Sequence, residues 1–473
     1  MSVALALLPV VAVIVALVCR QSSLRAGVLG AGVAIVVAAT WFSLDLETAA
    51  RAAAEWWPLL LEVPLIMAGG IVFAEVGRET GAQARLSDWL RASLGGGVAP
   101  VLAIVHGVTP FAESVTGFGI GAVLAVPLLS ALGLDGRRAA IVGLLGLCTV
   151  PWGSMAPGSL IAAELGGVGF DAIGIASAIG SLPIFIVVGV AAVLVSGRSA
   201  GRSPGRGGRW IACLAAIGSA LVLWVGVLGA NLLAGTAPAG VLGGLFALAV
   251  HLLLSRLRGV RIEWSYELRR VLIPYAVLIG GVLVAGAIVR ICGATGTPWR
   301  FTASPAVWLF VAALVVARAR PGSLAAVRAR STATWARVGP ATGLFVLLGV
   351  VMSVSGMSEE IASWMADLGR GYLFMIPFIG ALGGFTTGSN SGSNAMFAAA
   401  HAHTVASIGA APLPALAAQN VSAALLTMAA PARIELAVRL CPDPPPRNAV
   451  QLPLLAIDLA LVALLGVVLL LAA

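Results

Sequence analysis

Apolar runs of about 18 or more residues follow one another from one end of this 473-residue chain to the other. A run of this length crosses the hydrocarbon core of a bilayer as a helix. Hydrophobic residues make up 60% of the chain and charged residues only 10%, a composition typical of membrane proteins with many spans rather than of a large soluble core. We therefore predict an all-α polytopic membrane protein with about twelve transmembrane helices.

The predicted spans are apolar segments bounded by charged residues or by Gly and Pro. They cover residues 4–19, 26–43, 57–77, 139–160, 170–197, 210–230, 238–255, 271–289, 304–318, 338–355, 411–430 and 450–471. Two further apolar regions, 97–132 and 371–406, are each interrupted by a short polar segment. Irregular polar backbone is tolerated at membrane depth only where protein buries it or where it lines a cavity. We predict that each region is a re-entrant hairpin with a polar tip.

The distribution of arginine supports this hairpin topology. If both regions are re-entrant, the arginine-rich loops lie on one side of the membrane, and the other side carries only Arg51, Arg290, Arg300 and Arg370. The positive-inside rule makes the arginine-rich side cytoplasmic and places both termini outside. Because the net charge of +9 resides in short loops, we attribute it to membrane orientation and do not expect nucleic-acid binding.

In this topology the first hairpin opens toward the cytoplasm and the second toward the outside, as an inverted repeat requires. A tryptophan precedes each tip at a similar spacing: Trp89 lies 22 residues before Phe111, and Trp364 lies 21 residues before Phe385. We therefore predict two inverted repeats joined by a linker with two transmembrane helices. The two repeats and the linker cover residues 1–197, 271–473 and 198–270, respectively.

The hairpin tips are rich in Gly, Ser, Thr and Asn, so their backbone can approach a ligand closely. The second arm of each hairpin begins at the tip, and N–H groups at a helix start favour an anion. We predict that the two tips, with the interrupted spans that follow them, hold a small organic anion. The predicted substrate-binding residues are Ser114, Thr116, Gly117, Gly119, Thr149, Gly153, Ser154, Thr387, Gly388, Ser389, Asn390, Ser391, Ser393, Asn394, Asn420 and Arg433. The alternative is that small residues merely allow close helix packing.

Glu113, in the first tip, is the leading candidate for proton coupling. A carboxylate at membrane depth is costly and usually marks an ion or proton pathway, and desolvation favours its protonated form. His106, in the first arm of the same hairpin, is a second candidate because histidine titrates near neutral pH. The alternative for Glu113 is a structural hydrogen bond to nearby backbone. The sequence does not decide between proton and sodium coupling.

No pattern typical of an enzyme, a cofactor or a metal site accompanies the tips. The five cysteines are scattered without a CxxC or Cys/His spacing, and no nucleophile–base pair or phosphate loop is evident. We expect no catalytic activity, no cofactor and no metal. The expected partners are the lipid bilayer, a small organic anion and a proton. The oligomeric state stays open, a homo-oligomer included.

Three blocks stand in order along the chain: Phe111-Ala-Glu-Ser-Val-Thr-Gly-Phe-Gly119, Val150-Pro-Trp-Gly-Ser-Met-Ala-Pro157 and Thr387-Gly-Ser-Asn-Ser-Gly-Ser-Asn-Ala-Met-Phe397. They resemble the L-lactate permease family of bacterial 2-hydroxy-monocarboxylate transporters. The resemblance implies proton-coupled uptake of lactate, glycolate or a related acid, and an inverted-repeat fold. The chain departs from the family where members often carry Asp at the place of Asn390 and Lys near Thr427. A change at these positions leaves room for a different anion.

Together these observations predict a secondary active transporter of the inner (cytoplasmic) membrane that moves a small carboxylate such as L-lactate or glycolate by proton symport. A transporter of another organic anion, a passive anion channel and a non-transporting membrane scaffold are the alternatives. Accumulation against a substrate gradient, abolished by an uncoupler, would distinguish the transporter from the channel and the scaffold.

Overall fold

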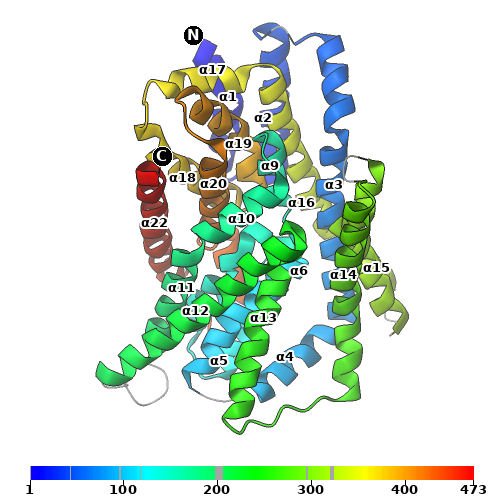
Figure 1. The fold of residues 1–473 in the computed structure, drawn as a ribbon, viewed down its shortest axis with the longest axis vertical. Helices are drawn as coiled ribbons and strands as arrows, with labels where there is room; N and C mark the ends of the chain where they lie inside the picture. Colours follow the sequence, from blue (N-terminus) through cyan, green and yellow to red (C-terminus); the bar gives the residue numbers. More distant parts are fainter. Residues whose placement is uncertain are drawn as a thin grey trace.

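The computed structural model describes residues 2–42, 44–94, 97–117, 119–197, 206–294, 297–319 and 324–472. Every regular element in these ranges is a helix, and Figure 1 shows most of them running along the long axis of the molecule. Ten helical segments in these ranges are long and apolar enough to cross a membrane, or up to eleven if the bent pair α9 (Pro157–Leu165) and α10 (Phe170–Gly180) forms one span. The predicted all-α polytopic membrane fold is confirmed.

The other helices bear the following bounds: α1 (Ser2–Val18), α2 (Ser23–Thr40), α3 (Leu46–Glu79), α4 (Ala82–Ser93), α5 (Val98–Ala103), η1 (Ile104–Val108), α6 (Thr109–Thr116), α7 (Ile120–Ala131), α8 (Gly136–Leu145), η2 (Gly146–Met155), α11 (Leu182–Ser196), α12 (Arg206–Ala234), α13 (Thr236–Leu257), α14 (Tyr266–Ile291), η3 (Pro298–Ala303), α15 (Pro305–Ala319), α16 (Leu324–Val354), α17 (Met357–Ala366), α18 (Gly371–Thr387), α19 (Asn390–Ser407), α20 (Pro412–Leu426), α21 (Pro431–Arg439) and α22 (Arg447–Ala472). Each predicted apolar run falls on one or more of these helices.

Two helices begin well before the apolar run that predicts them. The helix α16 begins at residue 324 rather than 338, and α3 begins at residue 46 rather than 57. One charged residue in the additional turns of α16 has two partners on α3: Arg330 Nε lies 2.8 Å from Glu75 Oε2, and the same guanidinium contacts Glu79. Because these charges are paired between helices, α16 extends beyond its apolar segment.

Both interrupted regions fold as helix–break–helix hairpins. In the first, residues 98–116 end at Gly117, Gly119 precedes α7, and α7 returns packed against α6 and η1. In the second, α18 and α19 pack against each other on either side of Gly388 and Ser389. In Figure 1, α5 lies near the lower end of the molecule, whereas α18 and α19 lie in the upper half. The two hairpins therefore enter from opposite ends.

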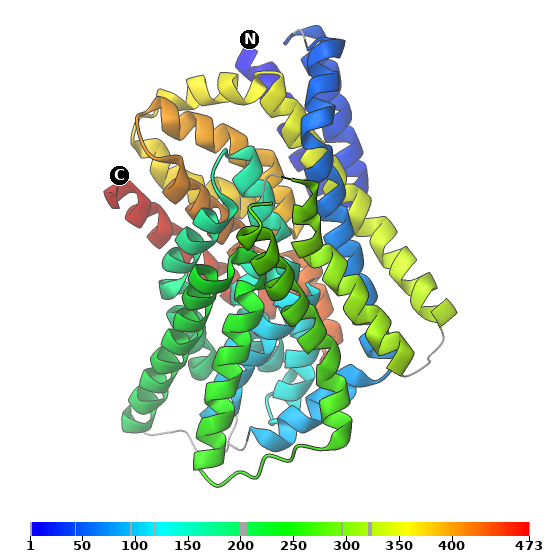
Figure 2. The same ribbon diagram turned by 45° about the vertical axis from the view of Figure 1, so that its right-hand side comes forward.

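A short helix precedes each hairpin. The helix α4 carries Trp89 and α17 carries Trp364. The two helices lie at opposite ends of the molecule in Figures 1 and 2. This arrangement accords with an inverted repeat, whose division into residues 1–197, 198–270 and 271–473 stays a prediction.

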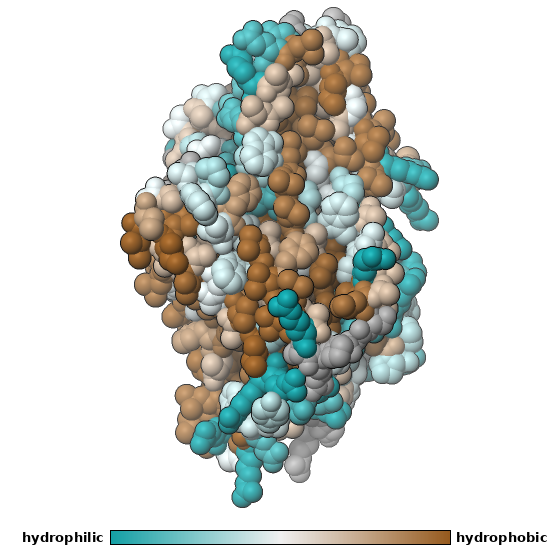
Figure 3. All heavy atoms as spheres, turned by 90° about the vertical axis from the view of Figure 1, so that its right-hand side faces the viewer, coloured by the Kyte–Doolittle hydropathy of each residue, from teal (hydrophilic) through white to brown (hydrophobic). Residues whose placement is uncertain are grey.

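The first hairpin and the broken helix after it lie at the centre of the molecule. In an 18-residue apolar stretch of residues 98–116, and in one of residues 136–155, 89% of the residues are buried, compared with 33% in a stretch of residues 208–234. Figure 3 shows the outer surface on one side, where apolar side chains cover much of the middle and hydrophilic side chains gather at the lower end. The polar tips are thus held inside a protein shell whose exterior suits lipid.

Candidate functional site

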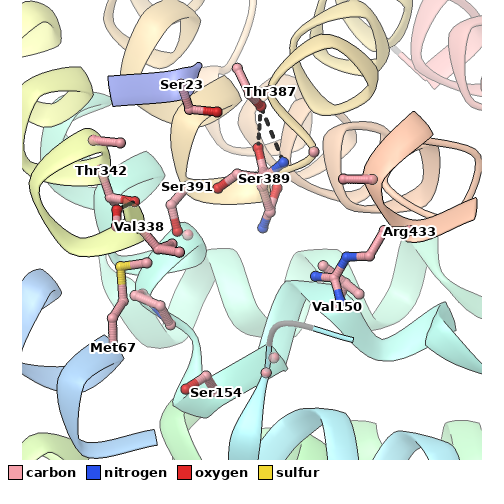
Figure 4. A pocket seen from close by; sticks show the side chains of 18 of the residues that line it. Ser23, Met67, Val150, Ser154, Val338, Thr342, Thr387, Ser389, Ser391 and Arg433 are labelled. Atoms are coloured by element: carbon pink, nitrogen blue, oxygen red, sulfur yellow. Dashed lines mark hydrogen bonds between the residues drawn. The ribbon is translucent and has the colours of Figure 1, made fainter. Parts of the chain in front are cut away.

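A cavity with a volume of about 430 Å³ lies where the two hairpin tips meet the broken segment that joins the end of η2 to α9. Its walls come from both tips, from η2 and α9, from α16 and from the first turns of α21 (Figure 4). Of the predicted residues, those that line it are Glu113, Gly117, Gly153, Ser154, Thr387, Gly388, Ser389, Asn390, Ser391 and Arg433. The structure therefore brings both predicted tips to a single cavity.

The residues of one wall of this cavity were not predicted from the sequence. This wall is formed by residues of α2, α3 and α16, namely Ser23, Met67, Thr334, Arg337, Val338, Ala341, Thr342 and Phe345. These residues lie within or beside apolar runs and form no polar cluster, so no local pattern marks them. Only the isolated charge of Arg337 offers a signal.

The backbone N–H groups of the first tip are largely occupied by the protein itself. Glu113 is buried, and its carboxylate accepts hydrogen bonds from the N–H of Gly119, at 3.1 Å to Oε1 and 3.0 Å to Oε2, and from the N–H of Gly121, at 3.2 Å to Oε2. The N–H of Gly117 donates to the Glu113 carbonyl at 2.8 Å. The amides of Gly117 and Gly119, which we predicted to bind substrate, therefore already have acceptors.

The hydroxyls of the first tip also lie away from the cavity. The Thr116 hydroxyl donates to the carbonyl of Ala112 at 2.6 Å. Ser114 faces α13, since a Cβ atom added to Gly240 would lie 2.3 Å from its Oγ. Neither residue lines the cavity, so their predicted binding role has no support from this geometry.

Glu113 also forms a buried ion pair with Arg433 of α21. Arg433 Nη1 lies 3.3 Å from Glu113 Oε1, and the two side chains are only 13% and 2% exposed. Figure 4 shows the Arg433 side chain reaching into the cavity from α21. Every polar contact described for the Glu113 carboxylate comes from an N–H donor or a cation, as expected for an ionised carboxylate. Its predicted role in proton coupling stays a prediction, and the geometry also gives it a structural role.

The broken segment contains three consecutive non-glycine residues in the left-handed conformation. Ser154, Met155 and Ala156 have φ angles of 45°, 65° and 71°. Such a conformation costs about 1–2 kcal/mol for each L-residue, and residues of this kind cluster at functional sites. The Ser154 hydroxyl is buried without a hydrogen-bond partner in the described chain. Thr149 Oγ1 is likewise buried and unpartnered, but Thr149 does not line the cavity.

The second tip keeps its first N–H groups free. Ser389 caps α19 by accepting a hydrogen bond from the Gly392 N–H at 3.2 Å, and Thr387 donates to the Gly383 carbonyl at 2.7 Å. Within the described chain, the N–H groups of Asn390 and Ser391 donate to no backbone or side-chain acceptor. Free donors at a helix start form a favourable site for an anion.

Two helix starts adjoin at this point. The helix α9 begins at Pro157, beside the start of α19, and a Cβ atom added to Gly158 would lie 3.2 Å from Ser391 N. Two positive helix ends side by side repel each other unless negative charge compensates them. Among the described lining residues, Arg337 and Arg433 carry positive charge and Glu113 carries negative charge, so the balance is 2 − 1 = +1. The cavity is therefore suited to a monovalent anion.

Behind the second tip lies a network of buried amide side chains. Asn420 Oδ1 accepts hydrogen bonds at 2.9 Å from Nδ2 of both Asn390 and Asn394, and Asn394 Nδ2 also lies 3.0 Å from the Gly158 carbonyl. The Ser393 hydroxyl donates to a backbone carbonyl of α18 at 2.8 Å. Ser393, Asn394 and Asn420 are fully buried and do not line the cavity. Their contacts are those of residues that hold α9, α18, α19 and α20 together.

His106 lies in a separate buried network. Its Nδ1 is 2.8 Å from the Ser219 hydroxyl, which is 2.8 Å from His251 Nε2, and its Nε2 is 3.1 Å from the Phe185 carbonyl. His106 does not line the cavity. Its coupling role stays a prediction without a direct contact to the site.

No group of three or more His, Cys, Asp or Glu residues suited to a metal ion occurs in the described part of the chain. The cavity presents hydroxyls, amides and an ion pair. Binding of an anion is what this arrangement can do.

Comparisons with known proteins agree with the predicted resemblance. The sequence profile of the L-lactate permease family matches residues 2–267 and 279–442. An L-lactate permease of Streptococcus iniae is 27% identical over 332 residues, which are 63% of this chain and 68% of that protein. The L-lactate permease of Escherichia coli K12 is 35% identical over 95 residues, 20% of this chain and 17% of that protein.

Among solved structures, the Alcanivorax borkumensis YdaH transporter, whose topology is described as unusual, aligns with a TM-score of 0.43 at 16% sequence identity. The alignment covers 90% of this chain and 89% of YdaH. The family assignment rests on the sequence match, which extends over both hairpins, the broken segment and α21. This multi-pass membrane protein belongs to the L-lactate permease family.

Proposed function

We propose that the protein is a secondary active transporter, not an enzyme, which moves a small monocarboxylate such as L-lactate or glycolate across the cytoplasmic membrane together with a proton. The observation that carries this proposal is the convergence of Arg433 and two helix starts on one cavity. A carboxylate matches these groups, because a guanidinium donates to it as a fork and helix N–H groups favour negative charge. Relatives named L-lactate permease support the same substrate class.

The charge balance of the cavity supports a monocarboxylate over a dicarboxylate. With a lining balance of +1, a monoanion brings the site to neutrality, whereas a dianion leaves one uncompensated negative charge beside Glu113. When the bound anion neutralises the cavity, moving the loaded site through a low-dielectric interior also costs less free energy.

A second cavity supports a transport path through the broken segment. This cavity has a volume of about 370 Å³ and is lined by Met155, Leu160, Glu62 and Arg300 among others. Ser154 lines the first cavity and its neighbour Met155 lines the second. We propose that residues 154–156 separate the access routes from the two sides of the membrane.

Thiol labelling tests this separation. In a background that lacks the exposed Cys19 and Cys292, a membrane-impermeant thiol reagent should reach Ser154→Cys from one side of the membrane and Met155→Cys from the other. Labelling of both variants from the same side would contradict the proposed barrier.

We further propose that the arginine-rich end faces the cytoplasm, with both termini outside and the two hairpins in inverted repeats. The entry of the hairpins from opposite ends supports the inverted repeats, and the positive-inside rule supports the orientation. An epitope tag at either terminus should bind an impermeant antibody added to the outside of right-side-out membranes. Access only after permeabilisation would reverse the orientation.

Uptake into proteoliposomes tests the function directly. Purified protein, with acid outside, should accumulate L-lactate or glycolate above the external concentration, and an uncoupler should abolish the accumulation. A dicarboxylate and a sulfonate in the same assay test specificity. Filling to equal concentrations would indicate a channel, and no uptake of any compound would reject transport of this substrate class.

A further inference from the structure

Asp458 is a buried carboxylate in the middle of α22 that no part of the site uses. Its side chain is 0% exposed, and neither carboxylate oxygen has a hydrogen-bond partner in the described chain. It also forms no ion pair with any described residue. It stands on the buried stripe of an otherwise apolar helix, which includes Leu454, Leu461 and Leu465. Sequence reasoning misses Asp458 because a single polar residue barely alters the hydropathy of so apolar a run.

The surroundings of Asp458 are apolar. The helix α22 packs against α18, the first arm of the second hairpin, and against α20, which follows that hairpin. Leu454 and Leu461 of α22 share a core cluster with Ala381 of α18 and Leu425 of α20. The position is therefore next to the elements that carry the second tip.

The charged and titratable groups on the helices packed against α22 have other partners. Arg137 of α8 donates to the Ala449 carbonyl, Arg138 pairs with Asp135, Tyr372 of α18 contacts His401, Arg433 of α21 pairs with Glu113, and Glu435 of α21 pairs with Arg439 and with Arg447. The described residues of α11 and α20 include no charged side chain. No described cation therefore compensates a negative charge at Asp458.

An ionised carboxylate without a cation or a donor is very unfavourable in an apolar interior, so this conformation holds Asp458 in its neutral form. A protonated Asp458 without an acceptor contributes no hydrogen bond to the fold, so packing alone does not explain it. Intramembrane carboxylates of this kind mark proton pathways. The contrast with Glu113 is direct, because Glu113 has a cation and several N–H donors.

We infer that Asp458 is the proton-binding residue of the transport cycle. The inference rests on the proposed function. Asp458 takes up a proton when the outward-open state hydrates it, keeps the proton in the closed apolar environment, and releases it to water on the cytoplasmic side. One proton then accompanies one monocarboxylate, so the transport step is electroneutral.

Infrared spectroscopy tests the protonation state without any transport assay. At neutral pH, the wild-type protein should show the C=O stretch of a protonated carboxyl group, and Asp458→Asn should lose it. Glu435→Gln is the matched control, because Glu435 is a carboxylate in a peripheral ion pair, and this variant should keep the band. Persistence of the band in Asp458→Asn, or its absence from the wild type, would overturn the inference even if the protein transports lactate.

Transport measurements in proteoliposomes test coupling. With a gradient of one pH unit, a 1:1 symporter accumulates its anion about tenfold, so the wild type and Glu435→Gln should approach this ratio. Asp458→Asn should reach a ratio near one, yet retain exchange of internal and external lactate, because Asn resembles the protonated state. Accumulation by Asp458→Asn at the wild-type ratio, or loss of exchange in a folded variant, would overturn the inference. Failure of the wild type itself would instead count against the proposed function.

Discussion

The two hairpin tips have similar compositions and opposite electrostatic states. At the first tip, the Glu113 carboxylate accepts hydrogen bonds from the N–H groups of Gly119 and Gly121. A side chain of the protein therefore occupies the anion-binding position of this tip. At the second tip, the N–H groups of Asn390 and Ser391 have no acceptor in the described chain. A glycine-rich helix start therefore binds a ligand only if no internal side chain already fills it. We interpret the first tip as the holder of Arg433 and the second as the ligand site.

The largest expected effect concerns the internal anion of the first tip. Glu113→Gln leaves the buried guanidinium of Arg433 unpaired and should reduce the free energy of unfolding by about 3–5 kcal/mol. The double variant Glu113→Gln/Arg433→Gln should recover part of this loss, because no charge is then left uncompensated. Thermal unfolding in detergent measures both. Additive losses in the double variant would show that the pair is not coupled.

The next effect concerns the cation that the two tips share. Arg433→Gln removes hydrogen bonds to a charged ligand, a loss of about 1.5–3 kcal/mol of interaction free energy. The value of kcat/KM for lactate should therefore fall roughly 10- to 150-fold. Arg439→Gln, on the same helix but paired with Glu435 near the surface, is the control and should transport normally. Equal effects of the two variants would argue against a ligand at Arg433.

A pair of glycine substitutions compares the space at the two tips. Gly117 has φ and ψ angles of 67° and −161°, a region open essentially only to glycine, whereas Gly388, at 64° and 20°, is in the left-handed helical region, so alanine strains the backbone more at Gly117. A Cβ atom on Gly117 would lie 2.7 Å from Ser154 Cβ, whereas the nearest contact for Gly388 is 3.8 Å, to Ala430 Cβ. Gly117→Ala should therefore cost about 1–3 kcal/mol more stability than Gly388→Ala. Similar unfolding temperatures would mean that the first tip is not closely packed.

The smallest effects separate the surface of the second tip from the network behind it. Asn394→Ala removes buried hydrogen bonds and should lower stability by about 1 kcal/mol for each bond lost, while the protein still inserts into the membrane. Ser391→Ala, at the cavity wall, should leave stability unchanged within about 0.5 kcal/mol. Uptake per folded molecule should then be nearly normal for Asn394→Ala. A large rise in KM for that variant would instead support the predicted binding role of Asn394.

The helices and both hairpins could be predicted because a membrane-spanning helix needs a long apolar segment and because unpaired polar backbone is unfavourable in hydrocarbon. The early starts of α3 and α16 could not. In α16 the charge of Arg330 is paired with Glu75 of α3, and α3 begins with exposed, charged turns that Asp45 caps. A hydropathy profile treats each charged residue without its partner, so it predicts helices that are shorter than those in the structure.

The candidate site was only half accessible to sequence reasoning. Local composition marks both tips, but it does not say that Glu113 and Arg433, 320 residues apart in sequence, form one ion pair. The same limit applies to Asn394 and Asn420, which resemble ligand-binding residues in sequence and bind each other in the structure. Asp458 lies four residues after Leu454 and three before Leu461, a spacing that places it on the buried face of its helix. This spacing is a weak sequence signal.

An experimental structure with bound L-lactate or glycolate tests the comparison of the two tips most directly. We predict that the carboxylate lies within hydrogen-bond distance of Arg433 and of the N–H groups of Asn390 and Ser391, with Glu113 still bound to Gly119. A carboxylate bound at the N–H groups of the first tip, with Glu113 displaced, would contradict this assignment.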